Sequence, residues 1–248
     1  MKQRAEPLIF GHRGASSACP ENTLAAFREA AGGGAAGIEL DTHLSADGKL
    51  VVCHDETVNR TTNGKGFLKD MTSEEIRKLD AGSWFAASFA GERVPFLEEV
   101  LELCGERNLE VNIELKTDYF PYPGIEKKTA ELVAAFGMED RVIVSSFNHY
   151  SIVAFKGIAP RVRAGLLYNC RIYRPERYAG GLPAEALHPA MHLLSPQNIA
   201  DAHGAGYEVN VWFYGETWDE EAAERNIRSG VDRIITNFPR QYAALLSR

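Results

Sequence analysis

Short apolar runs alternate with helical segments along most of this chain. The runs predict eight strands, at residues 8–12, 37–43, 110–116, 142–146, 164–168, 192–194, 208–213 and 233–236. Helices are predicted at about residues 20–31, 96–107, 125–136, 149–157, 175–186, 196–203 and 217–229, and from residue 239 onward. Such alternation implies parallel strands joined by right-handed crossovers. Eight units in about 250 residues predict an α/β fold, a (β/α)8 barrel.

A doubly wound open sheet is the alternative architecture. No GxGxxG sequence follows the first predicted strand, which weakens a dinucleotide-binding version of that alternative. No solenoid-type repeat is visible in the chain. The barrel therefore remains the favoured fold.

A predicted hairpin follows the second strand. Residues 46–49 contain an Asp-Gly turn signal, and residues 50–54 form another apolar run. Pairing of this run with the strand at 37–43 would bring His54 and Asp55 back toward that strand.

Residues from about 56 to 94 break the alternation. They contain a loop at 60–66 and a short helix for which Thr72 is a good N-cap. Three aromatic residues lie among small ones in this segment, at Trp84, Phe85 and Phe89. We therefore predict a single domain over residues 1–248, with a small cap inserted between the second and third barrel strands.

Composition predicts a globular chain that does not cross a membrane. The 248 residues are 45% hydrophobic and 25% charged, with a net charge of −7. This balance argues against nonspecific binding to nucleic acid or anionic membranes, although a local cation can still attract an anionic substrate. No apolar run approaches the roughly 20 residues of a membrane span, and residues 1–7 lack a signal-peptide core. The four cysteines show no zinc spacing, so reduced thiols and a cytoplasmic location are expected.

The predicted strand at 37–43 carries an unusual pair of carboxylates. Alternation along a strand puts Glu39, Asp41 and His43 on one face. Unpaired charge is costly to bury, and a hard cation at the end of the strand would offset that cost. The alternative is a half-exposed edge strand with solvated acids.

Other polar residues stand at the carboxyl ends of the predicted strands, where barrel active sites lie. These residues are His12, Arg13, Glu114, Lys116, Phe147, Asn148 and Trp212. Glu39, Asp41 and Glu114 together would form an all-oxygen cluster, which suits one divalent cation, Mg²⁺ or Ca²⁺. For Glu114, the alternative is a structural ion pair with Lys116.

Two histidines and two cations complete the predicted chemistry. His12 and His54 are candidates for the catalytic acid and base, because imidazole titrates near neutrality. Alternatively, each of these histidines is a structural residue whose polar atoms are simply hydrogen-bonded. Arg13 can bind a phosphate through two hydrogen bonds, and Lys116 can add a point charge. Alternatively, both cations only neutralise the acidic cluster.

The remaining candidates have more ordinary interpretations. His43 is expected to line the substrate site or to be structural, because hard cations seldom need imidazole. Asp55 either orients the adjacent histidine or caps the loop, and Glu21 and Asn22 are expected to cap a helix. Trp212 either forms a wall of the substrate pocket or packs in the core. A structural role is expected for His149, His188, His192 and His203.

Motifs over nearly the whole chain resemble the glycerophosphodiester phosphodiesterases. They are Gly11-His12-Arg13-Gly14-Ala15, Pro20-Glu21-Asn22-Thr23, Glu39-Leu40-Asp41, Asp47-Gly48, His54-Asp55, Arg60-Thr61-Thr62 with Gly64, Asn112-Ile113-Glu114-Leu115-Lys116, Ser146-Phe147, Val211-Trp212, Gly230-Val231-Asp232 and Ile235-Thr236-Asn237-Phe238-Pro239. The matches are highly specific in the first half and looser in the last third.

The resemblance implies a TIM barrel whose inserted cap shapes the glycerol side of the site. It implies an enzyme that cleaves a small-molecule glycerophosphodiester into glycerol 3-phosphate and an alcohol. The divalent cation would lie on Glu39, Asp41 and Glu114, the acid and base would be His12 and His54, and the phosphate would lie on Arg13 and Lys116.

The chain departs from the family pattern at two places. Residues 213–215 read Phe-Tyr-Gly, where the family has a small polar residue and a Thr/Val/Asn pattern after its tryptophan. Asn237 stands where the family often has Asp. Both departures bear on substrate fit more than on the chemistry. The alternative functions are a lysophospholipase D-like enzyme, with Trp84, Phe85 and Phe89 either holding an acyl chain or packing the cap, and a noncatalytic phosphodiester-binding protein.

Overall fold

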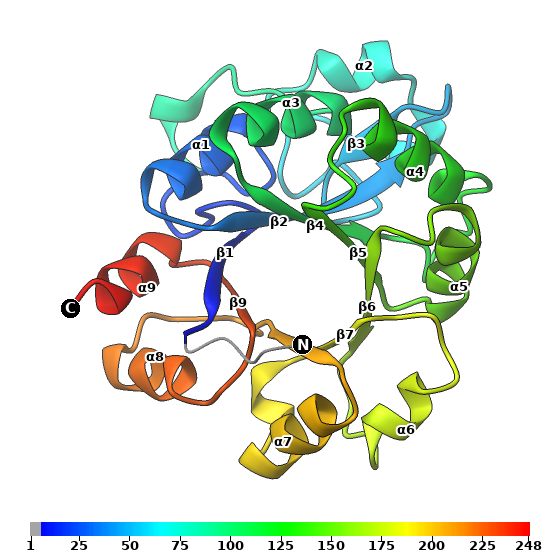
Figure 1. Cartoon of the computed structure of the whole chain (residues 1–248). Helices are drawn as coiled ribbons and strands as arrows, with labels where there is room; N and C mark the ends of the chain where they lie inside the picture. The colour runs from blue at the N-terminus through cyan, green and yellow to red at the C-terminus, as the bar shows by residue number, and fades with distance from the viewer. Residues whose placement is uncertain (1–5) are drawn as a thin grey trace.

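A closed barrel of parallel strands forms the centre of the molecule. The computed structural model describes residues 6–248. The barrel strands are β1 (Leu8–His12), β2 (Gly37–Leu44), β4 (Glu110–Leu115), β5 (Val142–Ser146), β6 (Arg163–Tyr168), β7 (Ala186–Pro189), β8 (Glu208–Val211) and β9 (Arg233–Thr236). Parallel pairing of β1 with both β2 and β9 closes the ring, as Figure 1 shows. The predicted (β/α)8 barrel is confirmed.

Helices surround the barrel on its outer side (Figure 1). They are α1 (Leu24–Gly32), α3 (Leu97–Arg107), α4 (Ile125–Ala135), α5 (His149–Ile158), α6 (Pro175–Ala179), α7 (Pro196–Gly204), α8 (Glu220–Ile227) and α9 (Pro239–Leu246). Side-chain caps begin several of them, because a cap oxygen accepts one of the unpaired backbone N–H groups of the first turn. Thr23, Asn148, Ser195 and Asp219 cap α1, α5, α7 and α8 in this way.

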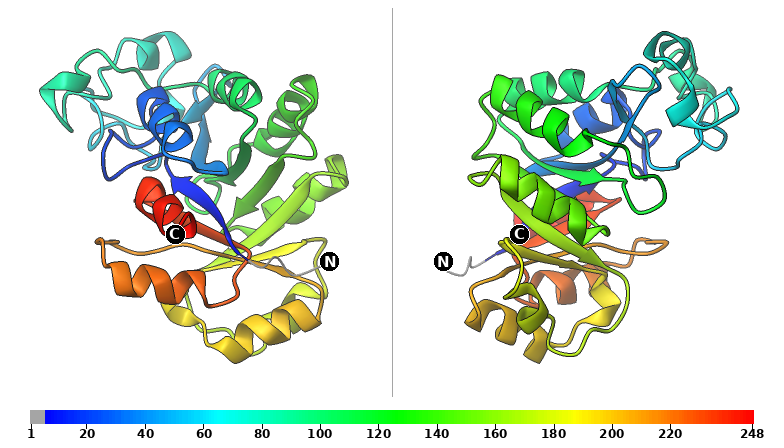
Figure 2. Two further views of the ribbon diagram at one scale, coloured as in Figure 1. Left: turned by 60° about the vertical axis from the view of Figure 1, so that its left-hand side comes forward. Right: turned by 90° about the vertical axis from the view of Figure 1, so that its right-hand side faces the viewer.

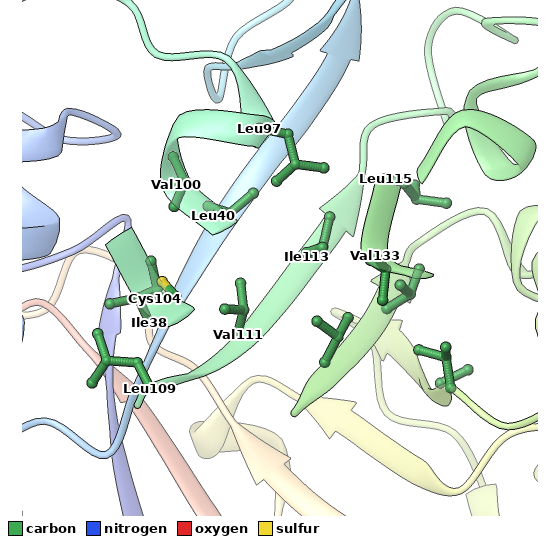
Figure 3. Packing of buried hydrophobic residues seen from close by; sticks show 14 of the residues in the cluster. Ile38, Leu40, Leu97, Val100, Cys104, Leu109, Val111, Ile113, Leu115 and Val133 are labelled. Atoms are coloured by element: carbon green, nitrogen blue, oxygen red, sulfur yellow. The ribbon is translucent and has the colours of Figure 1, made fainter. Parts of the chain in front are cut away.

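The outer face of β2 explains the orientation of its carboxylates. Ile38 and Leu40 are fully buried in the same hydrophobic cluster as Leu97, Val100 and Cys104 of α3, as Figure 3 shows. Successive strand side chains point to opposite faces. The acidic residues of β2 therefore point toward the interior of the barrel.

A layer of ion pairs fills the amino end of the barrel. Arg233, of which only 1% is exposed, contacts Glu110 at 2.9 Å and Glu208 at 2.6 Å. Arg163 contacts the same Glu110 carboxylate at 2.9 Å. These four residues begin β9, β4, β8 and β6, so the charges meet at one level. Pairing compensates for the cost of burying the charges.

The hairpin and the inserted cap lie where the sequence predicts them. β3 (Leu50–Val52) pairs antiparallel with β2. The cap contains the short 3-10 helices η1 (Leu68–Asp70) and η2 (Ala87–Phe89) and the helix α2 (Ser73–Arg77), which Thr72 caps. Its hydrophobic cluster is separate from that of the barrel and consists of Val51, Cys53, Val58, Leu68, Ile76, Ala81, Val94 and Phe96. The cap extends beyond the barrel in both views of Figure 2.

Two sequence-based boundaries are wrong. The strand predicted at 192–194 is replaced by a short 3-10 helix, η3 (Met191–Leu193), and the barrel strand is the earlier β7, which begins at residue 186, where the predicted helix was to end. β7 pairs with β6 and β8, and its four residues end in a proline. The leucines at 193 and 194 are more typical of a buried strand than the sequence of β7 is, which explains the wrong prediction. The first helix, predicted to open at 20–23, begins only at Leu24.

The cysteines and the helices bear on two further predictions, reduced thiols and the lack of a membrane span. All four cysteines are free thiols, as predicted. Over residues 6–248, no helix has the length and apolar character that crossing a membrane requires.

Candidate active site

A cavity of about 830 Å³ lies at the carboxyl ends of the barrel strands. Its walls include all but one of the predicted site residues, namely His12, Arg13, Glu39, His54, Glu114, Lys116 and Trp212. Asp41, with 1% exposure, is not among the lining residues. The structure therefore gathers the predicted residues around one space.

Strand register brings the three predicted carboxylates together. Asp41 of β2 lies opposite Glu114 of β4, and Glu39 lies opposite Asn112 on one side and His12 of β1 on the other. Glu39, Asp41 and Glu114 are buried, and each offers an oxygen within 4.8 Å of those of the other two. Three carboxylates at this spacing can hold one hard cation.

The electrostatics of the cluster favour a cation. Burial and the charges of Asp41 and Glu114 raise the pKa of Glu39 well above its usual range. Burial also raises the pKa of Glu114, although Lys116 opposes this shift. A bound divalent cation would favour the ionised form of both groups. In addition, the buried side-chain oxygen of Asn112, which lines the cavity, has no hydrogen-bond partner among the described residues. These features fit a hydrated metal ion.

The turn after β1 aims Arg13 at this cluster. Arg13 has a left-handed backbone (φ 55°), and Gly14 follows with φ 83°. A Cβ at Gly14 would come within 2.6 Å of the Ala26 backbone, so only glycine fits there. The Arg13 backbone N–H donates to Glu39 Oε2 at 3.0 Å, and its Nε lies 3.4 Å from Asp41 Oδ2. The turn thus places a cation beside two of the acids.

Glu21 and Asn22 do not cap a helix, which corrects the sequence-based interpretation. The Asn22 side-chain amide donates to Asp41 Oδ2 at 2.9 Å. Glu21 accepts hydrogen bonds from Arg13 and from Arg60 of the cap. Both residues therefore support the site through long-range contacts, and the neighbouring threonine is the cap.

Lys116 contacts the carboxylates and also lines the cavity. Its Nζ lies 2.9 Å from Glu114 Oε1 and 3.8 Å from Asp41 Oδ1. Although burial opposes the shift, these acids raise the pKa of Lys116, so the amine stays charged. The ion pair considered from the sequence is therefore present, and it holds a positive charge at the cavity wall.

His12 is held by a neutral amide. Its Nδ1 lies 2.7 Å from the side-chain oxygen of Asn237, which also accepts from the Ser16 hydroxyl at 2.9 Å. An amide oxygen only accepts, so this contact assigns the proton to Nδ1 and leaves the lone pair on Nε2. Nε2 lies 4.0 Å from Glu39 Oε2. Burial, with help from Arg13, lowers the pKa of His12 to about 4.

His54 is held by a carboxylate. Its Nδ1 donates to Asp55 Oδ1 at 2.7 Å, and this bond holds the pKa of Asp55 below its usual range. Asp55 therefore orients the histidine, which was one of its two predicted roles. His43 is fully buried, with Nδ1 3.1 Å from the Tyr122 hydroxyl and Nε2 3.2 Å from the His54 carbonyl oxygen. Its role in the structure is to support the His54 loop.

The cavity wall has a charged half and an uncharged half. Every Asp, Glu, Lys and Arg among the lining residues belongs to the segments from β1 to the loop after β4. The half formed by β5 to β9 and their loops includes Phe147, Leu167, Tyr168, Ile172, Trp212 and Tyr214. Trp212 packs edge to face against Phe147 and Tyr214, with centroids 5.8 and 4.5 Å away, and its Nε1 donates to the His188 carbonyl. It forms a wall of the cavity and packs on the core.

The cap aromatics lie elsewhere. Trp84, Phe85 and Phe89 form an edge-to-face stack, and Trp84 Nε1 donates to the carbonyl of Ala81. None of the three lines the cavity. This arrangement agrees with a packing role within the cap.

The model of the glycerophosphoryl diester phosphodiesterase family matches residues 12–241. The chain belongs to this family. It is 48% identical over 232 residues to the glycerophosphodiester phosphodiesterase of Caldanaerobacter subterraneus subsp. tengcongensis, covering 94% of both chains. The resemblance seen in the sequence is therefore confirmed, and so is the prediction of an enzyme of this family.

Solved structures of family members share the fold. The glycerophosphodiester phosphodiesterase of Agrobacterium tumefaciens matches with a TM-score of 0.84 at 37% identity, over 96% of this chain and 99% of that one. A phosphodiesterase of Oleispira antarctica, solved with the product sn-glycerol-3-phosphate, matches with a TM-score of 0.86 at 28% identity, over 98% of both chains.

Sequence reasoning missed or underrated three residues of the site. Asn237, noted only as a departure from the family pattern, contacts His12, and Arg60 contacts Asp55. His149, expected to be structural, lines the cavity. A signal did exist for Asn237, because it directly follows β9, at the same strand-end position that identified the other site residues.

Proposed function

We propose that the protein hydrolyses glycerophosphodiesters to glycerol 3-phosphate and an alcohol, with one divalent cation and two histidines. The observation that carries the proposal is the arrangement of the cavity: two imidazoles, held by different partners, line the same space as Glu39 and Glu114, two of the three clustered carboxylates. The names of the relatives, and the product bound to the Oleispira enzyme, support this substrate class.

Glu39, Asp41 and Glu114 would hold the cation. Their donor set contains only oxygen, which suits Mg²⁺ or Ca²⁺. When bound, the cation would polarise a phosphoryl oxygen and the attacking hydroxyl.

We assign His12 as the general base and His54 as the general acid. His12 carries its proton on Nδ1, so Nε2 can accept a proton from the nucleophile, a water or a glycerol hydroxyl. As the new phosphorus–oxygen bond forms, the bond to the alcohol breaks. Attack by water gives glycerol 3-phosphate directly, whereas attack by a glycerol hydroxyl gives a cyclic phosphate that a water then opens in a second displacement. His54 donates the Nε2 proton to the departing alkoxide, and the Asp55 carboxylate, which accepts from Nδ1, orients the ring for this transfer.

Arg13 and Lys116 would bind the phosphate. Both are ionised and line the cavity beside the acid cluster. Their contacts with Asp41, Glu21 and Glu114 fix their positions before substrate arrives. Preorganised positive charge stabilises the negative charge that develops on the phosphoryl oxygens.

The test is release of glycerol 3-phosphate from glycerophosphocholine. We expect activity with Mg²⁺ or Ca²⁺ and a loss of activity after chelation with EDTA, restored by the added cation. Activity that persists unchanged after chelation would contradict the role of the cation. Binding of substrate without any turnover would favour a noncatalytic phosphodiester-binding protein.

A lysophospholipase D-like activity is the second candidate, favoured by the uncharged half of the cavity. Its lining side chains include Phe147, Leu167, Tyr168, Ile172 and Tyr214, which suit an apolar substituent on the substrate. A comparison of kcat/KM for glycerophosphocholine and lysophosphatidylcholine separates the candidates. A higher value for the lysophospholipid would favour the second.

A further inference from the structure

Arg60 of the cap joins two carboxylates, Asp55 and Glu21, beside the candidate active site. Its Nε and one terminal nitrogen donate to the two oxygens of Asp55, at 2.8 and 2.9 Å. Its terminal nitrogens also donate to the two oxygens of Glu21, at 2.7 and 2.8 Å. The guanidinium thus makes two bidentate contacts, the geometry that gives arginine–carboxylate pairs their strength and directionality. Arg60 itself does not line the cavity.

Each carboxylate that Arg60 holds has a second partner in the site. Asp55 Oδ1, which accepts from Arg60, also accepts from His54 Nδ1. Glu21 Oε1, which accepts from Arg60, also accepts from a terminal nitrogen of Arg13 at 2.9 Å. One side chain of the cap is therefore a single hydrogen-bonded residue away from both a predicted catalytic group and a predicted phosphate-binding group.

The orientation of both carboxylates depends on this contact. A carboxylate whose two oxygens are bound by one planar guanidinium cannot rotate freely. The oxygen that faces His54 is thereby fixed, and so is the one that faces Arg13. Supporting residues of this kind set the geometry of the residues that contact the substrate.

We propose that Arg60 is a positioning residue for the reaction, acting on His54 through Asp55 and on Arg13 through Glu21. The proposal rests on the proposed function for its kinetic consequences. It assigns the inserted cap a part in assembling the site, because Arg60 belongs to the cap, whereas His54 and Arg13 follow β3 and β1.

Kinetic double-mutant cycles test the contact of Arg60 with Asp55 and its contact with Glu21 separately. With glycerophosphocholine as substrate, we expect Arg60→Ala to lower kcat about tenfold, a part of the general acid contribution, and to raise KM roughly fivefold through the phosphate contact. In an Asp55→Asn background the same substitution should change kcat less than about twofold, and in a Glu21→Gln background it should change KM less than about twofold. Equal effects in the wild-type and substituted backgrounds would overturn the proposal.

Two further variants separate positioning from charge and from folding. Arg60→Lys keeps the charge but cannot make both bidentate contacts, so we expect it to remain impaired; full activity would overturn the proposal. Arg93→Ala is the matched control, because Arg93 is another cap arginine, and among residues 6–248 it donates only to the backbone carbonyls of Lys78 and Leu79. We expect this control to keep the wild-type kcat and KM.

A readout that needs no turnover separates this proposal from the proposed function. The ring ¹⁵N shifts of His54 report the hydrogen bond from Nδ1, and we expect them to change in Arg60→Ala but not in Arg93→Ala. Unchanged shifts in both variants would overturn the proposal. If the wild-type protein released no glycerol 3-phosphate, the proposed function would fail, while this measurement would still decide the role of Arg60.

Discussion

The two imidazoles of the candidate site have contrasting surroundings. The side chain of His12 is 17% exposed and donates to the neutral Asn237 amide, whereas that of His54 is 33% exposed and donates to the Asp55 carboxylate. In both rings Nδ1 is the nitrogen that the partner holds. The difference therefore lies in the charge of the partner and in the exposure of the imidazole, rather than in which ring nitrogen faces the site.

This contrast indicates how two identical side chains can take opposite roles. Burial beside an amide favours the uncharged imidazole, which is the form that accepts a proton. The Asp55 carboxylate accepts from Nδ1 of His54 and fixes that ring, so Nε2 is the nitrogen available to deliver a proton. The assignment of base and acid proposed above follows from this asymmetry.

Replacing each histidine gives the largest expected effect. We expect His12→Ala to lower kcat by about 10²–10⁴-fold for all substrates, because every nucleophile needs the base. His54→Ala should have an effect of similar size on glycerophosphocholine but a much smaller one on a p-nitrophenyl ester, whose leaving group needs no proton. Circular dichroism would serve as the control for folding. The opposite dependence on the leaving group would reverse the assignment.

Removal of the cation should have the next largest effect. We expect chelation to lower the rate about a hundredfold or more, because a cation supplies several kcal/mol of stabilisation to developing charge. Added Mg²⁺ or Ca²⁺ should also raise Tm by binding the folded state, and Glu39→Gln should reduce this rise. A cation-dependent Tm that is the same in the variant would place the ion elsewhere.

Asn237→Asp tests the comparison directly by giving both histidines a carboxylate partner. The new charge should raise the pKa of His12 from its value of about 4, by about one unit or more. Since the base must be neutral, the acidic limb of the kcat/KM profile should move to higher pH by the same amount. A profile that keeps its acidic limb would show that the partner's charge does not distinguish the two rings.

Glu216 gives the smallest expected effect, on stability. It accepts from the backbone N–H of Asn237, behind His12, and burial raises its pKa to about 7. Between pH 4.5 and 7 the folded state therefore holds a proton that the unfolded state has lost, so the free energy of unfolding should fall as pH rises, by on the order of 2 kcal/mol. Urea unfolding should show a smaller fall for Glu216→Gln. An identical pH dependence in the variant would rule out this group as the source.

Local periodicity explains why so much of the site could be predicted. The two-residue repeat of a strand puts Glu39 and Asp41 on one face whatever surrounds them, and parallel strands bring their carboxyl ends to one edge, where Glu114 also stands. By contrast, Glu21 has its partners at Arg13 and Arg60, the latter 39 positions along the chain. Contacts between residues so far apart in the sequence do not affect the local pattern of residues. A helix cap was therefore the expected role of Glu21.

The misplaced strand has a similar cause. β7 has only four residues and ends in a proline, so its apolar pattern is too short to distinguish a strand from a helix. Its pairing with β6 and β8 determines its structure. Only the closure of the whole barrel makes these four residues a strand.

The ion-pair layer at the amino end of the barrel has a consequence for how substrate enters and product leaves the cavity. Arg233, Arg163, Glu110 and Glu208 plug that end, and none of them lines the cavity. Substrate and products would then enter and leave the cavity at the opposite end, where the carboxyl ends of the strands lie. Under the proposed function, glycerol 3-phosphate bound there would block the next substrate molecule, so accumulated product should act as a competitive inhibitor.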